Sequence, residues 1–168
     1  MNVHVYIDGD NLYFLQRDLL GWRVDFRRML EHFGSYGEVT SANFYTGAAK
    51  KEQTTRLSFL RSLSHIGYRV VTRAAKESMV NGKVTHKVNL DTYIVRDMTL
   101  NLDQYDFVVL VTGDADFACM VETLHSRGKQ FKVYSADGCI ANELRELVGM
   151  NFVDIRTLKD ELEMKTDE

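Results

Sequence analysis

One short segment of the 168-residue chain joins a buried strand to a pair of acidic residues. The run Phe107–Val111 is entirely apolar and leads directly into Thr112-Gly113-Asp114-Ala115-Asp116. An apolar run of this length, bounded by turn residues, is typical of a strand covered on both faces, as in a parallel sheet. Open α/β sheets bind ligands at the carboxyl ends of their strands, so we expect the two aspartates at a functional edge.

The rest of the chain alternates predicted strands with predicted helices. Further strands are expected at 3–7, 38–45, 68–72, 130–134 and 151–155, and helices at 12–20, 25–33, 50–66, 89–100, 115–127, 140–148 and 158–164. This alternation predicts an α/β fold with a mostly parallel sheet and helices on both faces. Residues 73–87 interrupt it. They contain several cations and the hairpin signal Asn81-Gly82, and we predict a protruding hairpin or loop.

The length of the chain is that of one domain with a sizeable core. We place this domain at residues 1–157, followed by a charged extension at 158–168 that is partly helical or frayed. The formal net charge of −3 gives no global basic field, so any nucleic-acid binding requires a local patch.

The two cysteines and the apolar segments indicate the cellular compartment. Cys119 and Cys139 match no metal-ligand spacing, which favours two reduced and mostly buried thiols. No stretch approaches the length of a membrane span, and the chain starts directly with a strand rather than a signal peptide. We therefore expect a cytoplasmic protein with no membrane partner.

Four aspartates from three parts of the sequence are candidates for one site. Asp8 ends the first strand, and Asp91 lies in the first turn of the helix that Asn89 is expected to cap. If the first and central strands are neighbours, these two meet Asp114 and Asp116 at one edge. Clustered aspartates suit Mg²⁺ or Mn²⁺, ions that can activate water and clamp a phosphate. Asn11 could orient a carboxylate, water or phosphate there.

A second interpretation of the same aspartates involves no metal. A single aspartate at a strand end is more often an N-cap or turn residue than a ligand, and Asp116 could cap the following helix. Because three separate segments supply these four residues, a shared site is favoured. Spacing alone leaves both interpretations open.

Three blocks of sequence resemble a known family. Tyr6 to Leu12 is similar to a hydrophobic strand followed by D-G-x-N, and Val111 to Phe117 to [ST]-G-D-x-D-F. Asp91 and Asp97 are spaced as in K-x-x-D-x5-D. Together these blocks resemble the NYN domains, specifically the LabA-like group within the PIN-like nuclease superfamily, over nearly the whole chain.

The resemblance implies a PIN-like, three-layer α/β/α sandwich and a metal-dependent phosphodiesterase site that acts on RNA. By position, the acidic metal-binding set would be Asp8, Asp91, Asp114 and Asp116. Asn11 and Thr112 would be supporting polar residues that position water or phosphate. Asp10 falls on a position that varies in the family and stays outside this set. Asp97 matches a family aspartate and would support the ligands or cap the helix.

Two positions depart from the family pattern. Lys87 precedes Asp91 by four residues, where the family usually has a shorter gap and a glycine beside the aspartate. The segment 150–155 resembles the final strand of the family, with asparagine where an acid is common.

Aromatic and cationic residues near the predicted edge are candidates for substrate binding. Tyr13 and Tyr45 follow strand ends and could stack on unpaired bases. Arg73, Lys83 and Lys87 in the hairpin segment could hold flanking phosphates. Core packing for the aromatics and a solvated face for the cations are the alternatives.

These observations predict a ribonuclease that uses Mg²⁺ or Mn²⁺ and prefers single-stranded RNA. One alternative is a regulatory NYN module that binds RNA or protein without turnover. Another is a phosphatase of the haloacid-dehalogenase type, suggested by Asp8-Gly9-Asp10 and Gly113-Asp114, although Asn11-Leu12 replaces its expected Gly-Thr. A homodimer or a protein partner stays open.

Overall fold

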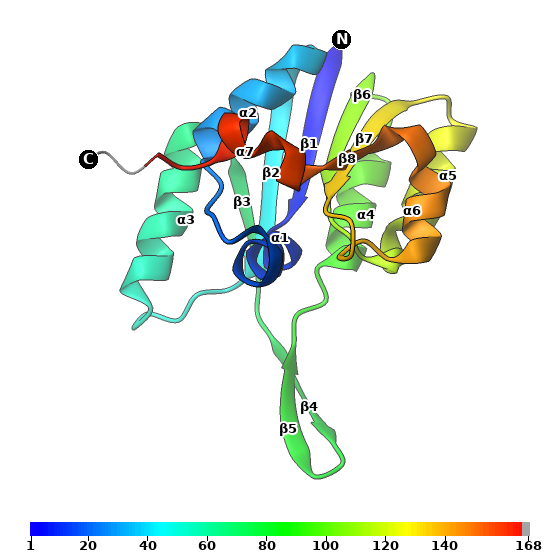
Figure 1. Ribbon diagram of the computed structural model, residues 1–168. Helices are drawn as coiled ribbons and strands as arrows, with labels where there is room; N and C mark the ends of the chain where they lie inside the picture. Colours follow the sequence, from blue (N-terminus) through cyan, green and yellow to red (C-terminus); the bar gives the residue numbers. More distant parts are fainter. Residues whose placement is uncertain (166–168) are drawn as a thin grey trace.

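The fold is built on one six-stranded sheet in which every pair of neighbouring strands is parallel (Figure 1). The computed structural model describes residues 1–165, apart from the side chains of residues 86 and 87. The strand order is β3-β2-β1-β6-β7-β8. The strands are β1 (Asn2–Asp8), β2 (Glu38–Gly47), β3 (Arg69–Arg73), β6 (Phe107–Val111), β7 (Gln130–Ser135) and β8 (Phe152–Asp154).

Helices cover the sheet on both faces, which confirms the predicted three-layer α/β/α sandwich (Figure 1). α2 (Phe26–Phe33), α3 (Thr54–Ile66) and α7 (Lys159–Leu162) lie on one face, and α4 (Asp91–Leu100), α5 (Ala118–Ser126) and α6 (Asn142–Val148) on the other. Alternate residues of β1 enter the two cores, with Val5 and Ile7 in one and Tyr6 in the other. α1 (Gly9–Leu15) and the π-helical turn η1 (Gln16–Leu20) follow β1 directly.

Short 3₁₀ segments complete the connections between these elements. They are η2 (Gly34–Tyr36), η3 (Ala115–Phe117), η4 (Gly149–Asn151) and η5 (Ile155–Leu158). The predicted helix at 115–127 therefore begins with a 3₁₀ turn, and the helix predicted from residue 50 begins at Thr54. Asp25 caps α2 as expected, because its side chain accepts from the N–H groups of Arg27 and Arg28.

Two local predictions are wrong. Asn89 does not cap α4: the N-cap residue is Leu90, which makes no side-chain capping bond, so α4 starts two residues later than expected. Cys119 and Cys139 are both exposed rather than buried. Cys119 lies on α5 and Cys139 in the loop before α6, and neither side chain points into a core.

The interrupting segment forms the predicted hairpin, which projects away from the body (Figure 1). β4 (Lys76–Val80) and β5 (Lys83–Lys87) pair in antiparallel fashion and make no sheet with the other strands. Asn81 and Gly82 both have positive φ, 52° and 73°, as a two-residue hairpin turn of this kind requires. All described side chains of the hairpin are exposed.

The predicted extension at 158–168 contains α7. Leu162 of this helix is fully buried in the same core as α2, and its carbonyl accepts from the N–H of Asp25. Residues 166–168 lie outside the described part of the chain. Within the described part, no helix has the length and apolarity to span a bilayer.

Candidate metal centre

The carboxyl edge of the sheet collects residues from three loops. β1 and β6 are direct neighbours, with Ile7 opposite Val111, so the expected adjacency of the first and central strands is confirmed. Asp8 ends β1, while Asp114 and Asp116 follow β6. α4 begins at Asp91 and brings its amino end to the same edge.

Three of the four predicted acidic residues converge. Asp91, Asp114 and Asp116 each offer a carboxylate oxygen, and these oxygens all lie within 4.8 Å of one another. Asp91 and Asp114 are half-buried and Asp116 is exposed, so the cluster is open to solvent on one side. Oxygen donors at this spacing could hold a hard divalent cation.

Asp114 also has a structural role. One of its oxygens, Oδ1, accepts from the N–H of Asp116 at 3.0 Å and caps η3. A carboxylate has two oxygens and about four acceptor sites, so capping is compatible with coordination. Both sequence interpretations of this residue, cap and ligand, therefore fit the same side chain.

Asp8 lies close enough to Asp91 to feel its charge and is only 5% exposed. Its Oδ1 accepts from the N–H of Asn11 at 3.1 Å and its Oδ2 from the Thr112 hydroxyl at 3.3 Å. Burial raises the pKa of Asp8 to about 6, and the nearby charges of Asp91 and Asp10 contribute to the rise. The structure thus places Asp8 beside the cluster, as a buried carboxyl that is costly to ionise.

Asn11 and Thr112 fix the two loops to each other. The Asn11 side-chain oxygen accepts from the N–H of Gly113 at 3.1 Å, and the Thr112 hydroxyl accepts from the N–H of Asp114 at 3.3 Å. These bonds set the positions of Asp8 and Asp114 relative to each other. The sequence predicts that both residues position water or phosphate, whereas in the structure their contacts hold the backbone of the site.

Two glycines allow the loops to approach closely. A Cβ added to Gly9 would lie 2.5 Å from the carbonyl oxygen of Tyr45 and from the ring of Phe44. One added to Gly113 would lie 2.6 Å from the Cys139 carbonyl oxygen and 2.7 Å from the Ser135 hydroxyl. The glycine in each acidic motif is therefore required by packing against a distant segment.

Replacing Gly113 by alanine is expected to destabilise the protein and to displace Asp114. Overpacking of this kind costs about 1–3 kcal/mol, which corresponds to a fall in Tm of several degrees in a chain of this size. Thermal unfolding would measure it. Gly34→Ala is the matched control, because an added Cβ there meets no sequence-distant atom of the described residues within 4 Å. An unchanged Tm for Gly113→Ala would contradict the packing argument.

Asp10 and Arg56 lie at this edge, although the sequence patterns predict no role for either. The Thr46 hydroxyl donates to Asp10 at 2.9 Å and accepts from the Arg56 guanidinium at 2.7 Å. Arg56 also donates to the Gly47 carbonyl, and its buried Nε has no hydrogen-bond partner among the described residues. Its position in a helix with a polar outer face gave no signal that the side chain turns toward the site.

The prediction that Tyr45 stacks on bases is wrong for this structure. Tyr45 is fully buried, and its hydroxyl donates to Asp97 at 2.8 Å. Asp97 is also buried and accepts two bonds from Arg96. Asp97 thus belongs to a hydrogen-bonded network with Tyr45 and Arg96, and it lies outside the acidic cluster of Asp91, Asp114 and Asp116.

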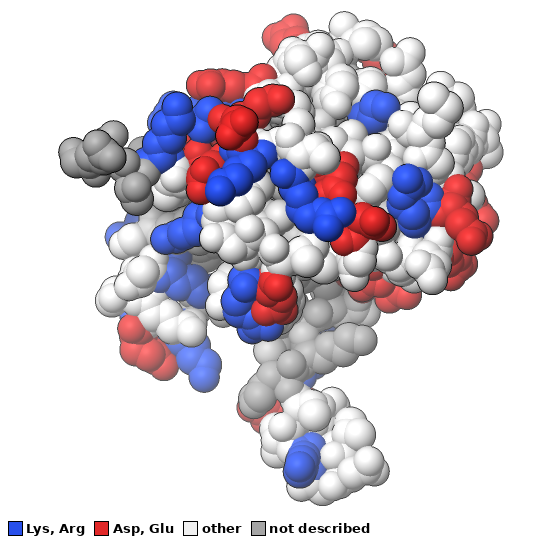
Figure 2. Space-filling model, viewed as in Figure 1, with Lys and Arg blue, Asp and Glu red and all other residues white. Residues whose placement is uncertain are grey.

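The other predicted substrate-binding residues lie at the surface, or their side chains lie outside the described part of the chain. Tyr13 is 58% exposed and packs edge-to-face on Phe14, over which Arg17 lies at 4.8 Å. Arg73 stacks on Tyr93, Lys83 is exposed on β5, and the side chain of Lys87 lies outside the described residues. On the face that Figure 2 shows, the described Lys and Arg residues are interspersed with Asp and Glu and form no broad basic patch.

Comparisons with known proteins agree with the sequence blocks and the fold. The profile of the NYN domain matches residues 2–156. The Low amplitude and bright protein LabA of Synechococcus elongatus is 34% identical over 162 residues, which cover 95% of this chain and 86% of that protein. The crystal structure of a protein of unknown function from Vibrio parahaemolyticus has a TM-score of 0.80 at 24% identity, covering 97% of this chain and 96% of the other.

Proposed function

Because this chain belongs to the NYN domain family, we propose that it is a metal-dependent ribonuclease that hydrolyses phosphodiester bonds of single-stranded RNA. The observation that carries the proposal is the convergence of Asp91, Asp114 and Asp116 at the carboxyl edge. The family assignment also favours this reaction over the phosphatase alternative. Cleavage takes place, in this proposal, on the open side of the cluster.

The donor set fits Mg²⁺ or Mn²⁺. All three converging groups are carboxylates, the ligands that these hard cations prefer, and Asp8 adds a buried fourth carboxyl nearby. When bound, such an ion supplies Lewis-acid polarisation of the phosphodiester and neutralises its charge. We assign Asp91, Asp114 and Asp116 as the ligands, with Asp8 completing the site.

The surrounding residues hold this arrangement in place before substrate arrives. Asn11 and Thr112 link the β1 and β6 loops, so the backbone that carries Asp8 and Asp114 is held in place. Such support by neighbouring hydrogen bonds is worth about 10–100-fold in metal affinity or activity at characterised sites. We therefore propose that Asn11 and Thr112 are positioning residues.

Tyr13 is the residue that we propose stacks on an unpaired base next to the cleaved bond. Tyr13→Ala is expected to weaken RNA binding about tenfold, because base–aromatic stacking contributes about 1–3 kcal/mol per base. Folding should be unaffected, since the side chain is 58% exposed. Fluorescence anisotropy with labelled RNA measures the effect, and Met150→Ala, at a 95% exposed position on η4, is the control. Equal affinities of all three proteins would remove Tyr13 from the interface.

The direct test of the function is cleavage of a labelled single-stranded RNA in Mn²⁺ or Mg²⁺, with EDTA as the control. The proposal predicts products that appear with metal and disappear with EDTA. A regulatory module without turnover is the second candidate, favoured by the capping bonds that Asp8 and Asp114 make. It predicts intact RNA under all these conditions.

A further inference from the structure

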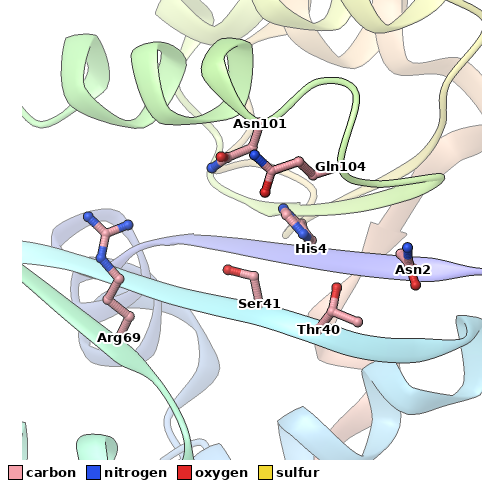
Figure 3. Close-up of a pocket in the computed structure, with 7 residues that line it drawn as sticks. All are labelled: Asn2, His4, Thr40, Ser41, Arg69, Asn101 and Gln104. Atoms are coloured by element: carbon pink, nitrogen blue, oxygen red, sulfur yellow. The ribbon is translucent and has the colours of Figure 1, made fainter.

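A polar pocket of about 480 Å³ lies on the α4 side of the sheet (Figure 3). It opens between β1, β2, β3 and the loop that follows α4, away from the acidic edge. Its lining is polar throughout and includes His4, Thr40, Ser41, Arg69, Asn101 and Gln104. Amide, hydroxyl, imidazole and guanidinium groups together provide both donors and acceptors, the mixture that nucleotide recognition requires.

His4 is built into the floor of this pocket. It is only 5% exposed, and its Nδ1 lies 3.3 Å from the Tyr6 hydroxyl. This contact is the one hydrogen bond that the imidazole makes among the described residues. Figure 3 shows the ring directed from β1 toward Asn101 and Gln104. The second ring nitrogen can therefore donate to or accept from a ligand in the pocket.

Two arginines share one carboxylate beside the pocket. Arg69 lies 3.7 Å from Asp97, which already accepts bonds of 2.7 and 3.0 Å from Arg96. Arg69 also donates to the Asn43 side chain at 3.3 Å, and its own side chain is 59% exposed. Two guanidinium groups around a single buried acid leave positive charge facing solvent, where a phosphate could be bound.

A stack of side chains extends from Arg96, which binds Asp97, to Arg73 at the end of β3. The ring of Tyr93 lies 4.2 Å from the Arg73 guanidinium carbon and 5.2 Å from that of Arg96. Tyr93 and Arg96 follow Asp91 on α4, and α4 ends next to Asn101. A helix of ten residues is about 15 Å long, and Asp91 and Asn101 lie at the two ends of α4. A short single-stranded RNA that begins at the acidic cluster can therefore reach the pocket.

We propose that Arg69, Arg73, Tyr93, Arg96 and the pocket form a flank-binding surface for single-stranded RNA. Tyr93 and its arginines stack on a base, Arg69 binds a phosphate, and the pocket takes a further nucleotide. This inference rests on the proposed function, because it names where the substrate runs beyond the cleaved bond. It predicts that RNA affinity depends on substrate length and on residues remote from the acidic cluster.

The test uses an Asp114→Asn background, so that binding is measured without cleavage. Anisotropy is recorded at fixed salt with labelled single-stranded RNAs of about 3 and about 12 nucleotides. Arg69→Gln is expected to weaken binding of the longer RNA about tenfold and to leave the shorter one unchanged within about twofold. The fold should persist, because Asp97 keeps its bonds to Arg96. Arg61→Gln, on an exposed position of α3, is the control.

The outcomes separate this inference from the ribonuclease proposal. Length-dependent loss in Arg69→Gln supports the surface even if the wild-type protein cuts no RNA. Cleavage by the wild type, together with equal binding by Arg69→Gln and Arg61→Gln, overturns the surface and leaves the ribonuclease intact. No RNA binding by any of the proteins overturns both. A change in oligomeric state of Arg69→Gln, without a change in RNA affinity, would assign this face to contact between copies and overturn the inference.

Discussion

Replacing Asp114 by asparagine is expected to reduce RNA cleavage by a factor on the order of 100 or more, with little change in folding. The substitution removes one of three converging carboxylates, so the remaining oxygens hold a divalent cation weakly. Asparagine can still accept from the N–H of Asp116, because asparagine is as good an N-cap as aspartate. Activity and stability should therefore separate in this variant.

The measurements are single-turnover cleavage of labelled RNA in Mn²⁺ and thermal unfolding of the same preparations. Asp103→Asn is the matched control, since Asp103 is an exposed aspartate in the loop between α4 and β6. Full activity in Asp114→Asn would show that the cluster takes no part in the reaction. A large fall in Tm with loss of activity would instead assign Asp114 a structural role.

Asp8→Asn is expected to stabilise the metal-free protein at pH 8 by up to about 3 kcal/mol. The folded pKa of Asp8, about 6, lies above the value of 3.8 for an unperturbed aspartate, because burial disfavours the charged carboxylate. Between these values the native protein keeps a proton that the unfolded chain has lost. The contribution of the Asp8 carboxyl to folding stability is thus fully present below about pH 4 and is lost as the pH rises through about 6.

The test is the difference in Tm between wild type and Asp8→Asn in EDTA, measured from pH 4 to pH 8. We expect a difference of several degrees at pH 8 in favour of the variant, shrinking toward zero at pH 4. Asp25→Asn, which alters the cap of α2 away from the cluster, controls for the loss of a capping carboxylate. A lower Tm for Asp8→Asn at pH 8 would mean that the folded protein stabilises the charge of Asp8.

Some features of this site could be predicted from the sequence because short, continuous sequence patterns identify them. An apolar run that ends in Thr112-Gly113-Asp114 identifies both the strand and the edge to which its acids belong. The hairpin turn was equally clear, because Asn81 and Gly82 adopt the positive φ values that few residue pairs tolerate. Three of the four predicted acids converge for the same reason: each lies next to an element boundary that periodicity reveals.

The remaining features of the site depend on contacts between segments that are far apart in the chain. Asn11 bonds to Gly113 across 102 residues, and Tyr45 to Asp97 across 52 residues. Nothing in the pattern around Tyr45 distinguishes a ring at the surface from one whose hydroxyl has a buried partner. Arg56 is a similar case, because its role follows from the hydroxyl of Thr46, which the sequence alone does not place beside it.

The most direct test of the central claim is a calorimetric titration of the wild-type protein with Mn²⁺, in the absence of RNA, compared with Asp114→Asn. If Asp91, Asp114 and Asp116 form a metal centre, the wild type binds the ion and the variant loses that binding. Equal binding by both proteins, or none by the wild type at millimolar Mn²⁺, would contradict a preformed metal centre at this edge.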